Sequence, residues 1–163
     1  MTKLTDLEIK KRLFAHKVYI LSNGKHGIKL NMEKCNLSGS DLSGSNLSYS
    51  NLRGSNLRDS DLSYSYLSGS DLRGSDLSYS NLRGSNLSYS NLSGSNLDYS
   101  CWGLSCKTLN VKIDKKIAVQ LLYHTMRAMQ FVDDKECKEF LRNKSNMKLV
   151  NQFHRVEECG EIT

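Results

Sequence analysis

Features typical of membrane, exported and disulfide-bonded proteins are missing from this 163-residue sequence. It has no run of about 18 apolar residues, the minimum for an ordinary transmembrane helix. No basic segment followed by an apolar run stands at its start, as a secretory signal requires. Its five cysteines are an odd number and include no Cys-X-X-Cys pair, which argues against a disulfide framework. We therefore expect a soluble protein of the reducing cytoplasm.

Signatures of catalysis and of cofactor binding are also lacking. No Ser or Cys nucleophile motif, no Gly-rich phosphate loop and no instructive carboxylate pair accompanies His124 or His154. Cys101, Cys106 and His124 could in principle hold zinc, but their spacing matches no compact metal motif. We expect a non-enzymatic protein without cofactor or metal, in which the two histidines have packing or surface roles.

What the sequence does contain is a leucine at every fifth position. In a strand, an odd spacing sends successive side chains to opposite faces, and in a helix five residues advance the direction by about 500°. Neither element can therefore collect these leucines on one side. Thirteen leucines share the phase: Leu37, Leu42, Leu47, Leu52, Leu57, Leu62, Leu67, Leu72, Leu77, Leu82, Leu87, Leu92 and Leu97. Such a short fixed period is typical of a solenoid, in which stacked units create the core.

Each repeat has the form Ser-(Asn/Asp)-Leu-X-X. Cys35 replaces the first Ser, and Tyr66 replaces Asn or Asp in one of the thirteen units. All leucines can point inward if the chain turns one corner per unit. The alternative is a disordered Ser/Gly-rich linker, but a linker has no physical reason to keep leucine in phase through thirteen units.

The unit closely resembles that of the pentapeptide-repeat family, whose fold is a right-handed quadrilateral β-helix with four units per coil. The resemblance covers residues 35–100. It implies that the leucine and the small residue two positions before it point inward, while the other positions face outward. This chain departs from the family pattern by using Ser where Ala is commoner, and by having no Phe in the core.

The resemblance and the flanking patterns together predict an all-β solenoid with two helical caps. Residues 1–31 would form an N-terminal cap, 32–105 the β-helix, and 106–163 a C-terminal helical cap or oligomerisation segment. Thr5-Asp6-Leu7-Glu8 is a capping box that predicts a helix over about 6–22, ending at Asn23-Gly24. The alternating Ile28, Leu30 and Met32 predict a short strand that leads into the first coil.

After Ser100 the leucine phase is lost, because Lys107 stands where leucine is due, which predicts that the solenoid ends there. Three short amphipathic helices are expected beyond it, beginning at Asp114, at Asp133 or Asp134, and at Ser145 or Asn146. The last would carry Leu149, Phe153 and Val156 on one face. Such C-terminal elements often form a dimer in the pentapeptide-repeat family, so the resemblance implies a homodimer.

The net charge of +6 is unevenly distributed. Residues 1–35 hold 8 basic and 3 acidic side chains, residues 36–100 hold 4 and 6, and residues 101–163 hold 11 and 8. Some members of the family mimic DNA and inhibit a topoisomerase through a strongly acidic shaft. The nearly neutral repeat segment makes inhibition of a topoisomerase by DNA mimicry a less favoured function here.

With four units per coil, residues twenty apart would stack in columns about 4.8 Å per step. One column holds Arg53 and Arg73 beside Gly54, Gly74 and Gly94, and another holds Asp59, Tyr79 and Tyr99. The other two hold Gly44, Tyr64 and Gly84, and Tyr49, Gly69 and Tyr89 near Tyr66. The candidate binding residues, of types enriched at binding hot spots, are Arg53, Arg73, Tyr49, Tyr66, Tyr89, Tyr79 and Tyr99. Alternatively, these residues merely fill outward positions of a degenerate repeat.

The arrangement of a basic helix, repeats and a helical tail resembles small pentapeptide-repeat proteins encoded by phages and prophages. That resemblance implies a rigid, non-catalytic module that binds and blocks, or scaffolds, a host protein in the bacterial cytoplasm. The alternative function is a binder or sponge of a phosphate-bearing ligand, a nucleotide or nucleic acid, that uses Arg, Tyr and the basic flanks.

Overall fold

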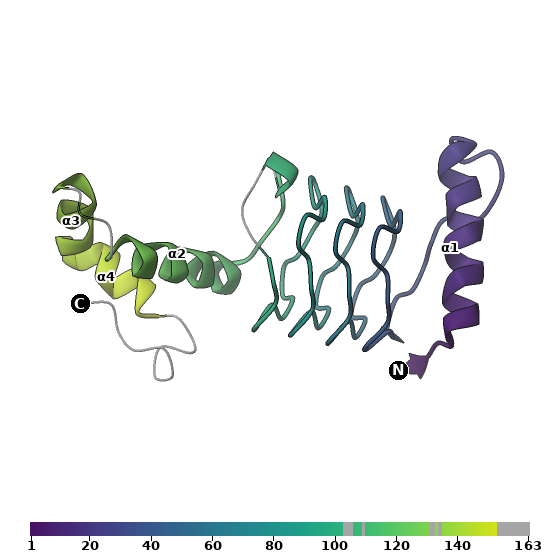
Figure 1. The fold of residues 1–163 in the computed structure, drawn as a ribbon, viewed down its shortest axis with the longest axis horizontal. Helices are drawn as coiled ribbons and strands as arrows, with labels where there is room; N and C mark the ends of the chain where they lie inside the picture. Colours follow the sequence, from purple (N-terminus) through teal and green to yellow (C-terminus); the bar gives the residue numbers. More distant parts are fainter. Residues whose placement is uncertain (103–105, 109, 131–132, 134, 153–163) are drawn as a thin grey trace. The chain divides into compact units, whose positions relative to one another are not determined.

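The structure, a computed structural model, describes residues 1–102, 106–108, 110–130, 133 and 135–152 (Figure 1). The chain divides into two compact units, Met1–Ile113 and Asp114–Thr163. The first contains strand β1 (Thr2–Lys3), helix α1 (Asp6–Leu21), strand β2 (Cys35–Asn36) and a short 3₁₀ turn, η1 (Cys106–Thr108). Among the described helices, none has both the length and the hydropathy needed to span a bilayer.

The repeats form a β-helix, visible in Figure 1 as a row of stacked coils beside α1. Parallel bridges join residues twenty positions apart, as in the column Asn31, Asn51, Asp71 and Asn91. The amide of each repeat leucine from Leu37 to Leu92 donates along the stack, for example from Leu62 to the carbonyl of Asn81 at 2.8 Å. This spacing confirms four five-residue units per coil. β1 pairs in parallel with β2 at the first coil.

The core of the β-helix is a column of leucine with serine beside it. All thirteen repeat leucines are buried, and none is more than 4% exposed. The serine two positions before each leucine is also enclosed in the central coils, where its hydroxyl donates to the carbonyl of the preceding leucine. Ser65 Oγ, for example, lies 2.7 Å from the carbonyl oxygen of Leu62. Because these hydroxyls have an acceptor, Ser can replace Ala in the interior without leaving an unsatisfied polar group; the exception is the buried Ser50, whose hydroxyl has no hydrogen-bond partner among the described residues.

Each corner is a β-turn that begins at the leucine. The serine amide three positions later donates back to the leucine carbonyl, as from Ser55 to Leu52 at 3.1 Å, and the third turn residue has a positive φ. The Asn or Asp before the leucine accepts from the amide two positions on, for example Asn51 Oδ1 from Arg53 N at 3.1 Å. This local bond explains why short polar side chains recur at that position.

The β-helix extends beyond the point where its leucine phase is lost. Leu87 N donates to Lys107 O at 2.8 Å, and Leu92 N donates to Lys112 O at 2.7 Å. These acceptors lie twenty residues ahead, whereas earlier coils use nineteen, as from Leu82 to Cys101. One additional residue between Cys101 and Lys107 therefore shifts the phase. The loss of leucine at Lys107 reflects this shift, and the solenoid does not end there as the sequence predicted.

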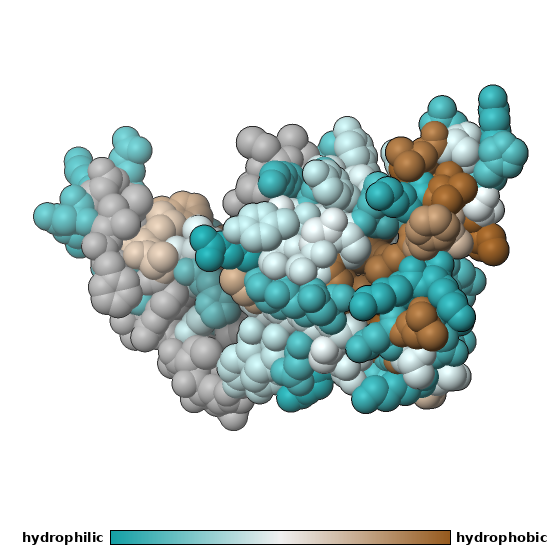
Figure 2. All heavy atoms as spheres, turned by 45° about the vertical axis from the view of Figure 1, so that its right-hand side comes forward, coloured by the Kyte–Doolittle hydropathy of each residue, from teal (hydrophilic) through white to brown (hydrophobic). Residues whose placement is uncertain are grey.

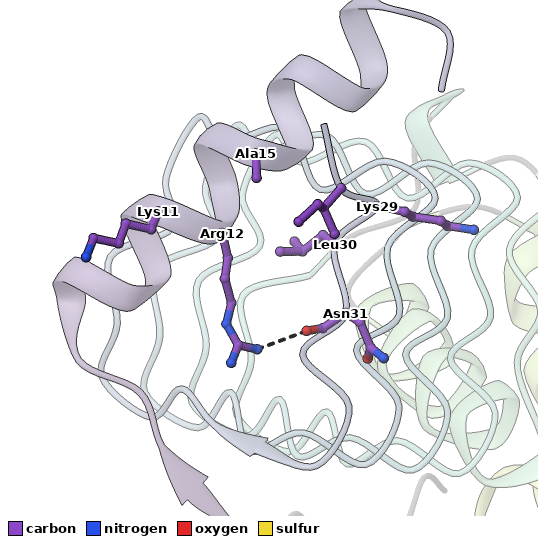
Figure 3. A pocket seen from close by; sticks show the side chains of 7 residues that line it. Lys11, Arg12, Ala15, Lys29, Leu30 and Asn31 are labelled. Carbon is purple, nitrogen blue, oxygen red and sulfur yellow. Dashed lines mark hydrogen bonds between the residues drawn. The ribbon is translucent and has the colours of Figure 1, made fainter. Parts of the chain in front are cut away.

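Helix α1 packs on the first coil through a buried histidine. The predicted helix and its capping box are confirmed, with Glu8 N donating to Thr5 Oγ1 at 3.3 Å. His16 is fully buried; its Nε2 lies 3.0 Å from Ser48 O, and its Nδ1 accepts from Leu30 N at 3.1 Å. Both contacts are satisfied when the ring is neutral and carries its proton on Nε2. Arg12 adds a hydrogen bond to Asn31 O at 3.0 Å, drawn in Figure 3.

The strand predicted before the first coil is reduced to one bridge, from Asn31 to Asn51. Leu30 and Met32 are buried as expected, but Ile28 is 71% exposed. Its amide donates to the carbonyl of Ala15 in α1. This segment does not form a longer strand because its backbone hydrogen bonds are shared between two partners, α1 at Ile28 and the next coil at Asn31.

The second unit contains α2 (Lys115–Met129), α3 (Lys135–Arg142) and α4 (Lys144–Val150). Asp114 caps α2 as predicted, accepting from Ile117 N at 3.0 Å. Asn143 caps α4, two or three residues earlier than the sequence suggested. The small core of the unit consists of Val119, Tyr123 and Met126, with Leu122, Met129, Leu141 and Met147 packed against it. Phe153, His154 and Val156, which were assigned to the last helix, lie outside the described residues.

We predict that Leu62→Ala lowers the free energy of unfolding by about 2–5 kcal/mol, because Leu62 is fully buried in mid-stack and its loss leaves a cavity. Arg83→Ser, an exposed change in the neighbouring coil, should alter it by no more than about 0.5 kcal/mol. Chemical denaturation measures both values. A loss of only a few tenths at Leu62 would contradict the inward orientation of the leucines.

A second prediction concerns pH. Burial, with help from the charge of Lys29, lowers the pKa of His16 although the Ser48 carbonyl opposes this effect. The unfolded chain, with an imidazole pKa of about 6.5, therefore binds the proton more readily than the folded protein. Stability should fall as the pH drops from 7 towards 5. Denaturation at several pH values should show a shallower decline for His16→Gln, and equal slopes in the two proteins would contradict the neutral buried ring.

Candidate binding faces of the β-helix

The twenty-residue repeat aligns outward side chains into columns, two of which concentrate functional groups. We call Arg58, Asp59, Tyr79 and Tyr99 the tyrosine face. Arg53 and Arg73, with the neighbouring Asp71, are the arginine face. The residues of both faces occupy either the two turn positions that follow a leucine or the bridge position before it. Hydrogen bonds between coils therefore fix the backbone from which these side chains extend.

The tyrosine face is a continuous stack of side chains. The rings of Tyr79 and Tyr99 lie 4.7 Å apart between centroids and are nearly parallel, at 23°. The guanidinium carbon of Arg58 lies 4.5 Å from the Tyr79 centroid, within cation–π range. Its Nε is 3.4 Å from the carboxylate of Asp59. The two tyrosines remain 47% and 56% exposed, so the stack is ordered and still open to solvent.

The remaining candidate tyrosines do not join this stack. Tyr49 lies over Gly69 of the next coil, where an added Cβ would come within 2.7 Å of its ring. Tyr64 covers Gly84 in the same way, at 2.8 Å. Tyr66 occupies a bridge position, and Tyr89 is highly exposed. The structure therefore brings Tyr79 and Tyr99 together and leaves Tyr49, Tyr66 and Tyr89 outside their stack.

Five tyrosines occupy a backbone conformation that favours glycine. Tyr49, Tyr64, Tyr79, Tyr89 and Tyr99 have φ between 57° and 60°, in the left-handed region. An L-residue costs roughly 1–2 kcal/mol there, whereas glycine adopts it freely. Glycine fills the same turn position elsewhere in the β-helix, for example at Gly54 and Gly74. The turn alone does not account for a large aromatic side chain, and strain of this kind often marks functional positions.

The arginine face is less cationic than the sequence suggested. Arg73 Nε donates to Asp71 Oδ1 at 2.8 Å, and Nη2 donates to Oδ2 of the same carboxylate. This bidentate pair lowers the pKa of Asp71 and raises that of Arg73. Arg53 lies exposed one coil away and also contributes to lowering the Asp71 pKa. The carboxylate of Asp71 thus supplies, from within the chain, the negative charge that offsets the repulsion between the stacked arginines.

The described residues contain no cluster of three side chains that could hold a metal ion. His124 is exposed on α2 and lies edge-on to Tyr123, at 5.4 Å between centroids. Cys101 is an exposed free thiol on the β-helix. The side chain of Cys106 and all of His154 lie outside the described part of the chain.

The model of the pentapeptide-repeat family matches residues 35–74 and 65–100, in eight copies. Residues 35–100 therefore match the pentapeptide-repeat family. This confirms the resemblance seen in the sequence, and the family identifies the coils as a right-handed β-helix. The pentapeptide-repeat family consists of non-enzymatic structural and binding proteins, which agrees with the prediction that this protein is not an enzyme.

Solved structures of pentapeptide-repeat proteins are similar to this domain. Full-length QnrB1, a plasmid-mediated fluoroquinolone resistance protein, is 25% identical with a TM-score of 0.50; the match covers 57% of this chain and 43% of QnrB1. Rfr23 from the cyanobacterium Cyanothece 51142 is 27% identical over 56% of this chain and 65% of its own, with a TM-score of 0.27. The matched part thus spans less than half of QnrB1. No curated protein matches the chain.

The turn glycines allow a matched test of the tyrosine packing. Gly69 and Gly74 have nearly equal φ, +67° and +64°, but only Gly69 is covered by a ring. Gly74→Ala should cost about 1 kcal/mol through backbone strain alone. Gly69→Ala should cost clearly more, because Tyr49 must also move. Chemical denaturation of both variants gives the difference, and equal losses would contradict the position of the Tyr49 ring.

Proposed function

We propose that the pentapeptide-repeat domain is a rigid, non-catalytic module that binds a protein partner through its tyrosine face. The observation that carries this proposal is the exposed stack of Tyr79 and Tyr99, held at a turn position where glycine would be unstrained. Tyrosine and arginine dominate binding hot spots. A face that is ordered before binding loses little conformational entropy on association, which favours affinity.

The chemistry of the two faces favours a protein over a phosphate-bearing ligand. Arg73 is already paired with Asp71, and Arg58 lies beside Asp59. A phosphate approaching either arginine would meet a carboxylate next to it. Nucleotide or nucleic-acid binding remains the alternative, supported by the exposed Arg53 and the basic N-terminal segment. DNA mimicry is disfavoured because residues 36–100 carry 4 Arg and 6 Asp, a nearly neutral balance.

The partner in this proposal is a bacterial host protein that is blocked or scaffolded in the cytoplasm, with the chain encoded by a phage, prophage or bacterium. The sequence resemblance supports this origin, and the likeness to a plasmid-mediated resistance protein is compatible with a bacterial setting. We further propose that α1 caps the first coil. Its support is the burial of His16, Ile9 and Leu30 between the helix and the coil.

The test is affinity capture from a bacterial lysate with the full-length protein and with Tyr79→Gly/Tyr99→Gly. Glycine is the right replacement because it adopts φ near +58° without strain, so the β-helix should keep its stability. We predict that the double variant loses the captured protein, or binds it at least about tenfold more weakly by calorimetry.

Tyr64→Gly/Tyr89→Gly is the matched control, since it removes two exposed tyrosines at the same strained turn position outside the stack. It should leave binding nearly unchanged. Capture of a nucleotide or nucleic acid with a steep salt dependence, lost in Arg53→Ser/Arg73→Ser, would instead establish the alternative. Equal losses of binding in the two double variants would show that the tyrosine face is not the specific binding site.

We also propose that the second unit forms a homodimer, for which its apolar surface is the support. Phe140 on α3 and Leu149 on α4 are 44% and 40% exposed although they belong to amphipathic helices. The small core of Val119, Tyr123 and Met126 does not enclose them. Exposed apolar groups of this kind often mark self-association surfaces.

We predict that Phe140→Ser/Leu149→Ser converts a dimer into a monomer, measured by light scattering coupled to size-exclusion chromatography. Leu7→Ser/Phe14→Ser, which removes two even more exposed apolar groups from α1, should leave the mass unchanged. A wild-type protein that is monomeric at every concentration would exclude the dimer.

A further inference from the structure

Helix α1 carries an exposed apolar stripe that the β-helix does not cover. Leu7, Phe14 and Leu21 are 61%, 70% and 74% exposed, and they follow one another at intervals of seven residues. Seven residues make about two helical turns, so the three side chains form one line about 21 Å long. Figure 2 shows apolar side chains gathered at the α1 end of this unit, among hydrophilic ones. The opposite side of α1 carries the buried Ile9 and His16.

Lysines border this stripe on both sides. Helical geometry places Lys10 and Lys17 along one flank and Lys11 along the other. All three are exposed, and none takes part in an ion pair with the described carboxylates. The two acidic residues of α1 lie in its first turn, and Glu8 is bonded to Thr5 in the capping box. The outer surface of α1 is therefore apolar at its centre and cationic at its edges.

A groove of about 360 Å³ runs beside the stripe, between α1 and the coil corner at residues 44–46. Leu13 and Ile20 line it together with Phe14 and Leu21, and Lys17 also reaches it. On the coil side Gly44 contributes no side chain, and an added Cβ there would meet nothing within 4 Å. The groove is thus apolar on its α1 side and small and polar on its coil side, at Gly44, Ser45 and Asn46, with open space at the corner and a cation at its rim.

We propose that this groove binds one acidic amphipathic helix of a partner protein. Its apolar side chains would lie along Phe14, Leu21 and the groove, and its Asp and Glu residues would meet Lys10 and Lys17. This is the helix-in-groove mode of recognition, in which apolar anchors recur every three or four residues. The site is separate from the tyrosine face, so it does not rest on the function proposed above.

Charge disfavours a second copy of the chain as the occupant, and the width of the apolar stripe disfavours a lipid surface. In a second copy, antiparallel pairing of two α1 stripes would bring Lys10 and Lys11 against Lys17 of the other copy, and like charges repel. A lipid surface binds helices whose apolar face covers about 100° or more. The stripe on α1 is only one side chain wide, and a flat bilayer would leave the adjoining groove unfilled.

A second pocket, of about 340 Å³, lies on the other flank of α1 and provides the control (Figure 3). It is lined by Lys11, Ala15 and Lys29, among others, and by Ile28, which is as exposed as Phe14. Arg12 is directed towards Asn31 there and bonds its carbonyl. Ile28→Ser therefore removes a comparable apolar group close to α1 but outside the proposed groove.

The probe is a synthetic amphipathic helix of about 18 residues, long enough to cover the stripe, with Leu at heptad positions a and d and Glu beside them. Its counterpart has Lys in place of Glu. Fluorescence anisotropy with the full-length protein should give at least about tenfold tighter binding of the acidic peptide, and added salt should weaken it. Phe14→Ser/Leu21→Ser should abolish the binding, whereas Ile28→Ser should retain it. Amide NMR shifts should concentrate on residues 13–21 and 44–46.

Any of five results would overturn the proposal. The first three are absence of binding to the acidic peptide, equal affinity for the two peptides, and equal losses in Phe14→Ser/Leu21→Ser and Ile28→Ser. The fourth is a mass by light scattering that falls in Phe14→Ser/Leu21→Ser, which would assign the stripe to a second copy of this chain. Vesicles of phosphatidylglycerol and of phosphatidylcholine test the lipid surface, and binding to the anionic vesicles in place of the peptide would likewise refute the proposal.

Discussion

The β-turn that closes each corner of the β-helix is the constraint on which the rest of the structure depends. In every unit the leucine carbonyl accepts from the serine amide three residues later, and the third turn residue takes a positive φ. The turn redirects the chain once per five residues, which is what sends all the leucines to one axis. Because the turn fixes the direction of each side chain, the serine two positions before the leucine also points inward and bonds a leucine carbonyl. The Asn or Asp before the leucine then supports the turn from outside.

The same constraint determines where binding groups can stand. Leucine, serine and the Asn or Asp are committed to the core and the corner, so only the two remaining turn residues can vary widely. One of these is the position that favours glycine, and there five tyrosines accept backbone strain. Tyr79 and Tyr99 stack on one another and on Arg58, whereas Tyr49 and Tyr64 cover glycines of the next coil. The binding surface of this domain is therefore determined by which residues occupy the two variable turn positions in each coil.

The periodic part of the molecule could be predicted from the sequence, because one residue type repeated in one phase has few geometric solutions. The buried leucines were expected on that basis, the four-unit coil was implied by the family resemblance, and the capping box of α1 was predicted from its own local motif. Individual side-chain contacts, within a unit or between distant segments, were not predictable. The Arg73 to Asp71 pair depends on side-chain conformations within one unit, and His16 bonds residues 14 and 32 positions away. The shifted phase after Cys101 arises from one additional residue, which in the sequence resembles the end of the repeat. Tyrosine at a glycine-favouring turn position was a signal present in the sequence, since both residues alternate at the same place in the unit.

Whether the phase of the leucines, and not their number, holds the β-helix together can be tested by exchanging two neighbouring residues. Leu67 is fully buried in the middle of the stack, and Ser68 beside it is half-buried on the outside. The double variant Leu67→Ser/Ser68→Leu keeps the composition and changes only the phase of one unit. The free energy of unfolding, measured by chemical denaturation, should fall by at least the roughly 2–5 kcal/mol of a leucine cavity. An exchanged protein as stable as the wild type would contradict the account, because it would mean that the inward direction is not fixed by the five-residue corner.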